Sequence, residues 1–156
     1  MNVDPYEAGK IPAGFWDRVK KKPVTGEIVV VLGLKLKSRE LDLIKQPTRV
    51  INRDEVHELI ATDEDAAPGR AVNNILYLGF FEVAAGGVIV VGDDLSLNQK
   101  HIGKLAGFNE IHAPNHINIV FKADQEFAER MKMRNGDGIV LDLPMRLGDK
   151  VTIERN

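Results

Sequence analysis

The chain has 156 residues, of which 44% are hydrophobic and 28% charged, a composition typical of one globular domain with a single core. The net charge of −2 argues against a dedicated nucleic-acid-binding protein, because such proteins carry a marked basic excess. There is no cysteine, which excludes disulfides, thiolate zinc sites and cysteine nucleophiles.

Residues 1–23 are interrupted by three prolines and two glycines, and this spacing rules out a long helix. We expect an N-terminal arm here rather than a folded unit. Its two large aromatic residues, Phe15 and Trp16, are expected to anchor the arm on the body of the protein or on a partner subunit, because aromatic side chains bury a large apolar area.

The sequence also predicts where the protein resides. The N-terminus lacks the basic stretch followed by an apolar stretch that marks a secretory signal. The longest apolar run, residues 75–91, is broken by glycines and a glutamate and is too interrupted to span a membrane. We therefore expect a soluble cytoplasmic protein with neither a membrane nor a nucleic-acid partner.

From residue 24 onward the pattern favours strands, and residues 24–156 are expected to form one β-rich domain. The strand-like segments are rich in β-branched residues and lie at 24–36, 41–43, 49–51, 75–83, 88–91, 139–143 and 151–153. Residues 56–62 also favour a strand, although Asn52 and Glu55 fit a helix capping box. The glycines at 86 and 87 predict a hairpin between the segments 75–83 and 88–91.

One helix is predicted, at about residues 125–134. Asp124 suits its N-cap and Asn135 its C-terminal end, while Phe127, Met131 and Met133 supply a buried stripe. With one helix among eight or nine short strands, the expected fold is mainly β, a single-domain barrel or sandwich.

Residues 104–122 hold two of the four histidines, and they predict a hairpin with a candidate site. If Ala113 to Asn115 form a three-residue loop, His112 lies opposite His116 and Glu110 opposite Asn118. Side chains alternate along a strand, so these four would share one face. Three isoleucines and a phenylalanine would occupy the other face, at positions 111, 117, 119 and 121.

His112, His116 and Glu110 are candidate ligands of a divalent metal such as zinc or iron, because opposed imidazoles can converge on one ion. Without metal, the same groups suit binding or proton transfer, and Asn118 suits a ligand contact. The structural alternative is that the histidines only hydrogen-bond loop carbonyls. A loop of two or four residues would disperse the set, because the pairing register would shift.

Other polar residues are weaker candidates. Arg70, Asp93 and Asp94 suit an anionic or hydroxylated ligand at the barrel mouth. His101 has the opposite parity to His112 and would face the other side of an unbroken strand, and His57 is expected to be exposed.

Two segments, residues 72–80 (VNNILYLGF) and 107–116 (GFNEIHAPNH), resemble an uncharacterised bacterial protein family. The resemblance implies no activity and carries over no functional residue. From the residues themselves, the leading hypothesis is a β-barrel protein that binds a small molecule or a metal at residues 110–118, with enzymatic activity left open. The alternative is a non-catalytic homo-oligomeric structural or interaction protein.

Overall fold

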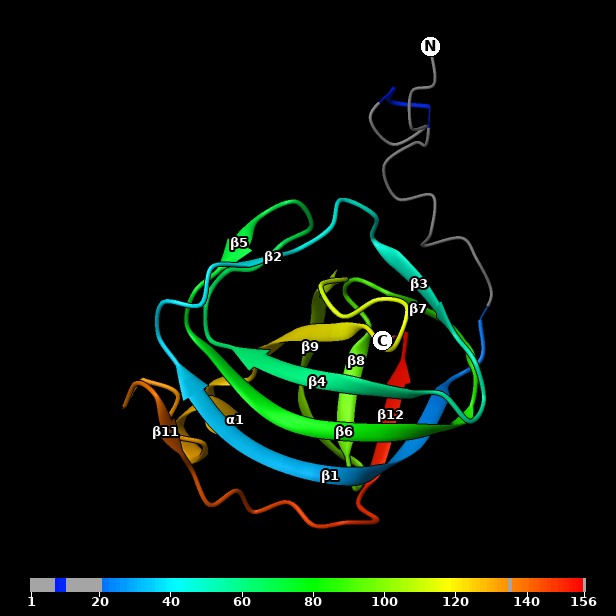
Figure 1. Cartoon of the computed structure of the whole chain (residues 1–156). Helices are drawn as coiled ribbons and strands as arrows, with labels where there is room; N and C mark the ends of the chain where they lie inside the picture. The colour runs from blue at the N-terminus through cyan, green and yellow to red at the C-terminus, as the bar shows by residue number, and fades with distance from the viewer. Residues whose placement is uncertain (1–7, 11–20, 135, 156) are drawn as a thin grey trace.

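In the computed structural model, the residues described are 8–10, 21–134 and 136–155. Seven strands close into a barrel in the order β1-β12-β8-β9-β10-β4-β6, and β6 pairs with β1 to complete it (Figure 1). The barrel strands are β1 (Val24–Leu36), β4 (Val56–Thr62), β6 (Ile75–Ala85), β8 (Asp94–Leu97), β9 (Lys100–Asn109), β10 (Asn118–Ala123) and β12 (Lys150–Glu154). The predicted mainly β fold is therefore confirmed as a closed barrel, and Phe15 and Trp16 lie outside the described residues.

Five other strands of the described residues lie outside the barrel wall. They are β2 (Leu41–Asp42), β3 (Thr48–Ile51), β5 (Ala71–Val72), β7 (Gly87–Val90) and β11 (Ile139–Val140). β11 extends β1 at one end, while β2 pairs with β5 and β3 with β7 as separate two-stranded ribbons. The β2–β5 ribbon covers part of the barrel's outer wall, where Leu41 and Val72 share an apolar cluster with Ile60 and Val120.

Alternation along β4 and β10 separates the inside of the barrel from its outside. On β4, Leu59 belongs to the interior core while Ile60 packs in the outer cluster. On β10, Ile119 and Phe121 share the apolar face that the sequence predicted, and this face is turned to the barrel interior. Ile111, expected on the same face, lies in the loop and is 60% exposed, so its placement was wrong. β4 and β10 run parallel, unlike the other neighbouring pairs of the barrel, so a long connection joins them through the rest of the wall.

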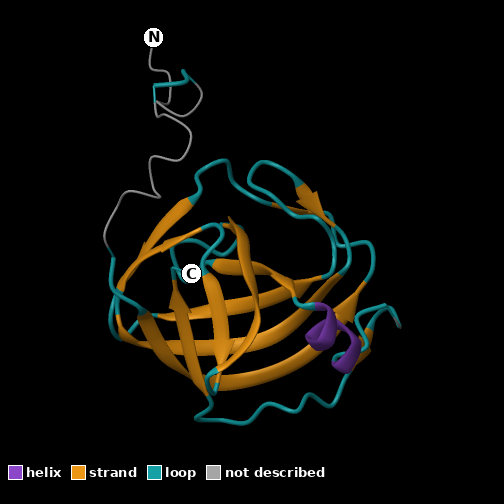
Figure 2. Ribbon diagram, turned by 180° about the vertical axis from the view of Figure 1, so that it is seen from behind, coloured by secondary structure: helices purple, strands orange, loops and turns teal. Residues whose placement is uncertain are grey.

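The predicted helix is confirmed but short, because α1 spans Gln125–Arg130. It ends where Lys132 takes a φ of 55°, a left-handed conformation that cannot continue a helix. Phe127 and Met131 are buried in the interior core, so α1 closes one end of the barrel (Figure 2). Asp124 makes no side-chain capping bond because its carboxylate lies 2.6 Å from His101, and Asn135 is outside the described residues.

The predicted hairpin between residues 75–83 and 88–91 is wrong. Both edges of β6 are occupied by β1 and β4, so β7 pairs instead with β3, from Thr48↔Val90 to Ile51↔Gly87. Gly86 permits the crossing, since a Cβ there would lie 2.6 Å from the Ile51 carbonyl oxygen. The predicted strand at 56–62 is confirmed as β4. The Asn52–Glu55 contact forms in the turn before it, where the Asn52 N–H donates to Glu55 Oε1 at 3.0 Å.

Candidate functional site

The segment between β9 and β10 is an eight-residue loop, residues 110–117, so the predicted three-residue loop is wrong. Asn118 pairs with Asn109 rather than with Glu110, and Val120 pairs with Gly107. The physical reason is that the loop backbone bonds to itself: the Ala113 N–H donates to the Glu110 carbonyl at 3.0 Å, and Asn115 N–H to that of His112 at 3.0 Å. These turns occupy backbone N–H and carbonyl groups that a longer pairing of β9 with β10 would need.

The loop still brings the two histidines together. The rings of His112 and His116 stack with centroids 4.9 Å apart, and His116 packs edge-on against Phe80 at 5.0 Å. Glu110 is not with them, because it faces Arg49 at 3.4 Å. Among the residues that the structure describes, no group of three or more His, Cys, Asp or Glu side chains is placed to hold a metal ion. The predicted set of Glu110, His112 and His116 stays a prediction.

A polar row crosses the outer wall of the barrel beneath this loop. Asn118 of β10 lies beside Glu58 of β4 on one side and Asn109 of β9 on the other, and Glu58 lies beside Phe80 of β6. Asn118 is thus on the polar face, as alternation predicted. Glu58 is only 5% exposed although it points outward, because the loop covers it.

Glu58 is the central residue that sequence reasoning missed. Burial raises the pKa of its carboxyl to about 7, and its Oε1 lies 3.9 Å from His116 Nε2, too far for a hydrogen bond. The only feature of the sequence that could have singled out Glu58 is its spacing: it lies two positions from apolar residues on either side, in a strand that is mostly buried. Its proximity to Asn118 depends on the parallel β4–β10 pairing, which local patterns do not reveal.

His116 presents an unprotonated ring nitrogen to this space. Its Nδ1 lies 2.9 Å from Asn115 Oδ1, and since that oxygen only accepts, the ring proton of the neutral form is on Nδ1. Burial, followed by the charges of His112 and His57, lowers the pKa of His116, and the Asn118 side chain partly opposes this. With the ring proton on Nδ1, Nε2 is a hydrogen-bond acceptor.

Asn118 presents a second acceptor. Its Nδ2 donates to Asn109 Oδ1 at 3.1 Å, and Asn109 is itself fixed because its Nδ2 donates to the Asp42 carbonyl at 2.7 Å. These two hydrogen bonds fix the orientation of the Asn118 amide, so its Oδ1 is directed away from Asn109. In the described part of the chain, three buried side-chain nitrogen or oxygen atoms lack a hydrogen-bond partner, and two of them are His116 Nε2 and Asn118 Oδ1.

His57 anchors the loop on β4. It was expected to be exposed, and this is wrong, since only 6% of its surface is accessible. Its Nδ1 accepts the Ile117 N–H at 3.1 Å and its Nε2 lies 2.8 Å from Glu55 Oε1, so the ring proton is on Nε2. The Glu58 N–H donates to the Ile117 carbonyl at 3.1 Å, so both backbone groups of Ile117 are hydrogen-bonded to β4.

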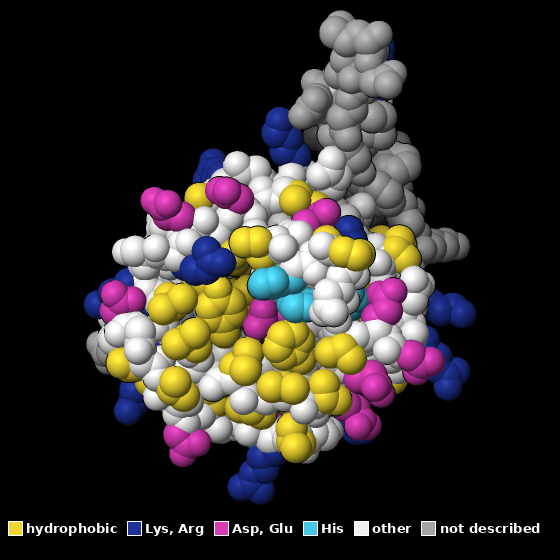
Figure 3. Space-filling view, viewed as in Figure 1, with side chains coloured by type: hydrophobic (Ala, Val, Ile, Leu, Met, Phe, Trp, Pro, Cys, Tyr) yellow, Lys and Arg dark blue, Asp and Glu magenta, His cyan; other side chains and the backbone are white. Residues whose placement is uncertain are grey.

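A cavity of about 440 Å³, the loop pocket, opens between this loop, β3 and the start of β4. Its lining comes from the two chain segments 49–57 and 113–117: Arg49, Val50, Asn52, Glu55, Val56, His57, Ala113, Pro114, Asn115, His116 and Ile117. Figure 3 shows histidine side chains gathered at the centre of this face, with acidic and apolar side chains around them.

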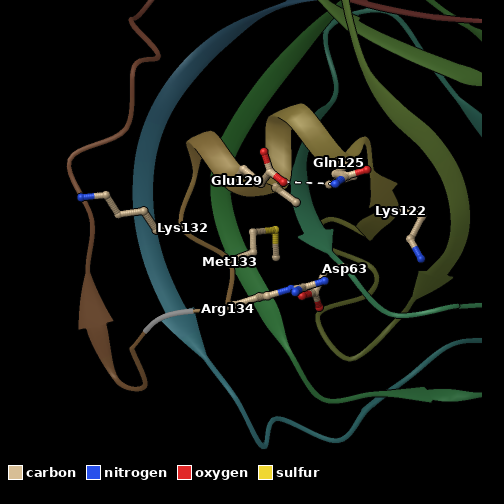
Figure 4. A pocket seen from close by; sticks show the side chains of 9 residues that line it. Asp63, Lys122, Gln125, Glu129, Lys132, Met133 and Arg134 are labelled. Atoms are coloured by element: carbon tan, nitrogen blue, oxygen red, sulfur yellow. Dashed lines mark hydrogen bonds between the residues drawn. The ribbon is translucent and has the colours of Figure 1, made fainter.

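A larger cavity, of about 570 Å³, lies beside α1 (Figure 4). Lys132 points away from it. Gln125 is bonded to Glu129 at 3.1 Å, and Lys122 is engaged by Asp65 at 2.9 Å. Charges of both signs line this cavity, and at least Lys122 and Glu129 already have partners, so it is a less selective site than the loop pocket.

The other predicted residues lie in neither cavity. His101 bridges Asp124 and Asp94, at 2.6 and 2.8 Å, and Lys104 also reaches Asp94 at 2.8 Å. Burial lowers the pKa of His101, but its hydrogen bonds to the two carboxylates outweigh burial and raise it.

Asp93 is buried and lies 2.6 Å from Lys21 Nζ, and it also accepts the Val90 N–H at 2.9 Å. Arg70 is exposed, and its carbonyl accepts the Leu43 N–H at 2.9 Å. The contacts of these residues fix loops to the barrel, and their ligand roles stay predictions.

The chain matches a protein-family model but no individual protein among the curated proteins and the solved structures. A family model matches residues 18–142, which include nearly the whole barrel and every residue of the loop pocket. This extent of match shows that the chain belongs to DUF6917, a family of unknown function.

Proposed function

We propose that the protein binds a small polar molecule in the loop pocket. The supporting observation is that His116, which lines the pocket, keeps a buried ring nitrogen without a hydrogen-bond partner. A buried acceptor left unpaired costs about 1–3 kcal/mol, so a fold that retains one gains from a group that fills it. The pocket's volume of about 440 Å³ is in the range of small-molecule sites.

Arg49 favours a ligand that carries an acidic group. Its guanidinium lies at the edge of the pocket, and its contact with Glu110 is long, at 3.4 Å, between side chains that are 35% and 39% exposed. Exposed pairs of this kind contribute little, so a carboxylate or phosphate that makes two hydrogen bonds to the guanidinium can displace Glu110.

The experiment is a fragment screen by two-dimensional NMR on chelator-treated protein, with small carboxylates and phosphates as probes. We expect hits whose shift changes map to residues 49–57 and 113–117, and weaker binding of the same hits to Arg49→Gln. The matched control is Lys122→Gln, at the other cavity. Hits that map only to the cavity beside α1, or a complete lack of hits, would contradict the proposal.

A second candidate function is self-association through the outer face of β4, β6 and β1. Apolar side chains gather on this face in Figure 3. Val29 and Val30 are 39% and 40% exposed, because a register shift between Ile28 and Val30 turns consecutive residues outward, and Val56 is 37% exposed. Exposed apolar patches of this kind mark association surfaces.

Sedimentation velocity over a range of concentrations tests this candidate. We expect a dimer or larger species in the wild type and a monomer for Val30→Lys. Val140→Lys is the control, because Val140 is 74% exposed on β11 at the end of β1. A wild type that stays monomeric at every concentration would rule self-association out.

No helix in the described residues is long and apolar enough to cross a membrane. The cytoplasmic location and the lack of a nucleic-acid partner stay predictions.

A further inference from the structure

We propose that Glu58, His116 and Asn118 bind one divalent transition-metal ion between them, on the outer wall of the barrel beneath the loop. The site differs from the metal set predicted by sequence, with which it shares only His116. It also goes beyond the proposed small-molecule function, because it does not need an organic ligand in the loop pocket.

Each of the three side chains carries an atom that can accept a hydrogen bond or bind a cation. His116 Nε2 is the unprotonated nitrogen because Nδ1 is turned to Asn115, and Asn118 Oδ1 is the free oxygen because Nδ2 is bonded to Asn109. Glu58 adds a carboxylate beside both, paired with Asn118 in the sheet and 3.9 Å from His116 Nε2. Clustered buried acceptors need a donor or a cation, since each costs free energy when unpaired.

The spacing suits a metal ion. Imidazole nitrogens and carboxylate oxygens lie roughly 2.0–2.2 Å from zinc, so two such ligands are about 3.4 Å apart at a tetrahedral angle and up to about 4.3 Å apart when opposed. The observed 3.9 Å between His116 Nε2 and Glu58 Oε1 falls inside this interval. Both unpartnered atoms are buried, which favours a bare ion over a bulkier organic cation.

The surroundings resemble the outer shell of a metal centre. A metal-binding histidine usually donates its second ring N–H to an oxygen, which fixes the ring, and Asn115 Oδ1 at 2.9 Å has this role for His116. Asn109 orients Asn118 in the same way. One imidazole, one carboxylate and one amide oxygen form a mixed nitrogen and oxygen set, which suits Zn²⁺ or Mn²⁺ with water completing the coordination.

The first test is calorimetric titration of the chelator-stripped full chain with Zn²⁺. We expect one equivalent to bind, and Glu58→Gln and His116→Ala each to weaken binding by about 100-fold or more. The matched controls are Glu110→Gln and His112→Ala, which alter the same residue types in the same region and should leave the affinity unchanged. Loss of binding in the controls but not in the first pair would overturn the proposal in favour of the other metal set.

A second measurement needs no variant. Mn²⁺ added to the stripped wild type should broaden NMR signals of residues 57–59 and 116–118 first. Broadening centred on Asp94 and His101 instead, or no binding of either ion, would overturn the proposal. Both proposals use His116 Nε2, so a metal ion would compete with a pocket ligand for this nitrogen. Fragment binding is measured without metal and metal binding without fragments, so each proposal is tested separately.

Discussion

Replacing Glu58 with glutamine should make the metal-free protein more stable at alkaline pH. Burial raises the pKa of Glu58 from its ordinary 4.5 to about 7, so the folded state prefers the protonated carboxyl. Below about pH 4.5 the carboxyl is protonated in both states and contributes no penalty. As pH rises from there to about 7 the unfolded state ionises first, and stability falls.

The size of the effect follows from the shift. A difference of about 2.5 pKa units at about 1.36 kcal/mol per unit gives a penalty of roughly 3 kcal/mol once the pH exceeds about 7. Glutamine has nearly the same shape and does not ionise, so Glu58→Gln should lack this penalty. The two proteins should have equal stability near pH 4, and the variant should be more stable by up to about 3 kcal/mol near pH 8.

Urea denaturation followed by circular dichroism, with a chelator present and at several pH values, measures the difference directly. Glu55→Gln is the control with the opposite sign. Hydrogen bonds from Asn52 and then His57 lower the pKa of Glu55, so its carboxylate stabilises the fold at neutral pH and this is lost on acidification. A difference between wild type and Glu58→Gln that does not vary with pH would refute the reasoning about burial.

Three further predictions concern contacts that hold the loops in place. Lys21→Met should lower the free energy of unfolding by about 3–5 kcal/mol, because it removes the ammonium group that pairs with the buried carboxylate of Asp93 and leaves that carboxylate with the hydrogen bond from the Val90 N–H. Lys22→Met, at an exposed position, is the control, and equal losses would contradict this. The pKa of His101 is raised, so the stability that its charged form contributes is present at acidic pH and is lost as pH rises through the folded pKa. The melting temperature of His101→Ala should therefore differ most from that of the wild type below about pH 6. A difference that is largest at alkaline pH would contradict this assignment. His57→Ala should speed amide hydrogen exchange at Ile117, because the bond that protects this N–H is removed, and unchanged exchange would show that the loop is held by other contacts.

The sequence by itself determined the features that depend on local periodicity. Alternation correctly placed Ile119 and Phe121 together on an apolar face and Asn118 on the opposite, polar face, because the side-chain period of a strand is fixed by its own backbone. The burial of Phe127 and of Met131, the residue that caps α1, was also predicted correctly, since a helix repeats along its own length.

Only the tertiary structure decided which strands are neighbours and what covers them. The parallel pairing of β10 with β4 places Glu58 beside Asn118, and the eight-residue loop then buries Glu58 on an outer wall that alternation alone would leave exposed. Loop length was misjudged because bonds within the loop replaced ladder bonds at Glu110 and His112, and nothing in the residue pattern separates these two outcomes. The chemistry of the candidate site comes from burial, and burial depends on contacts between segments far apart in the chain.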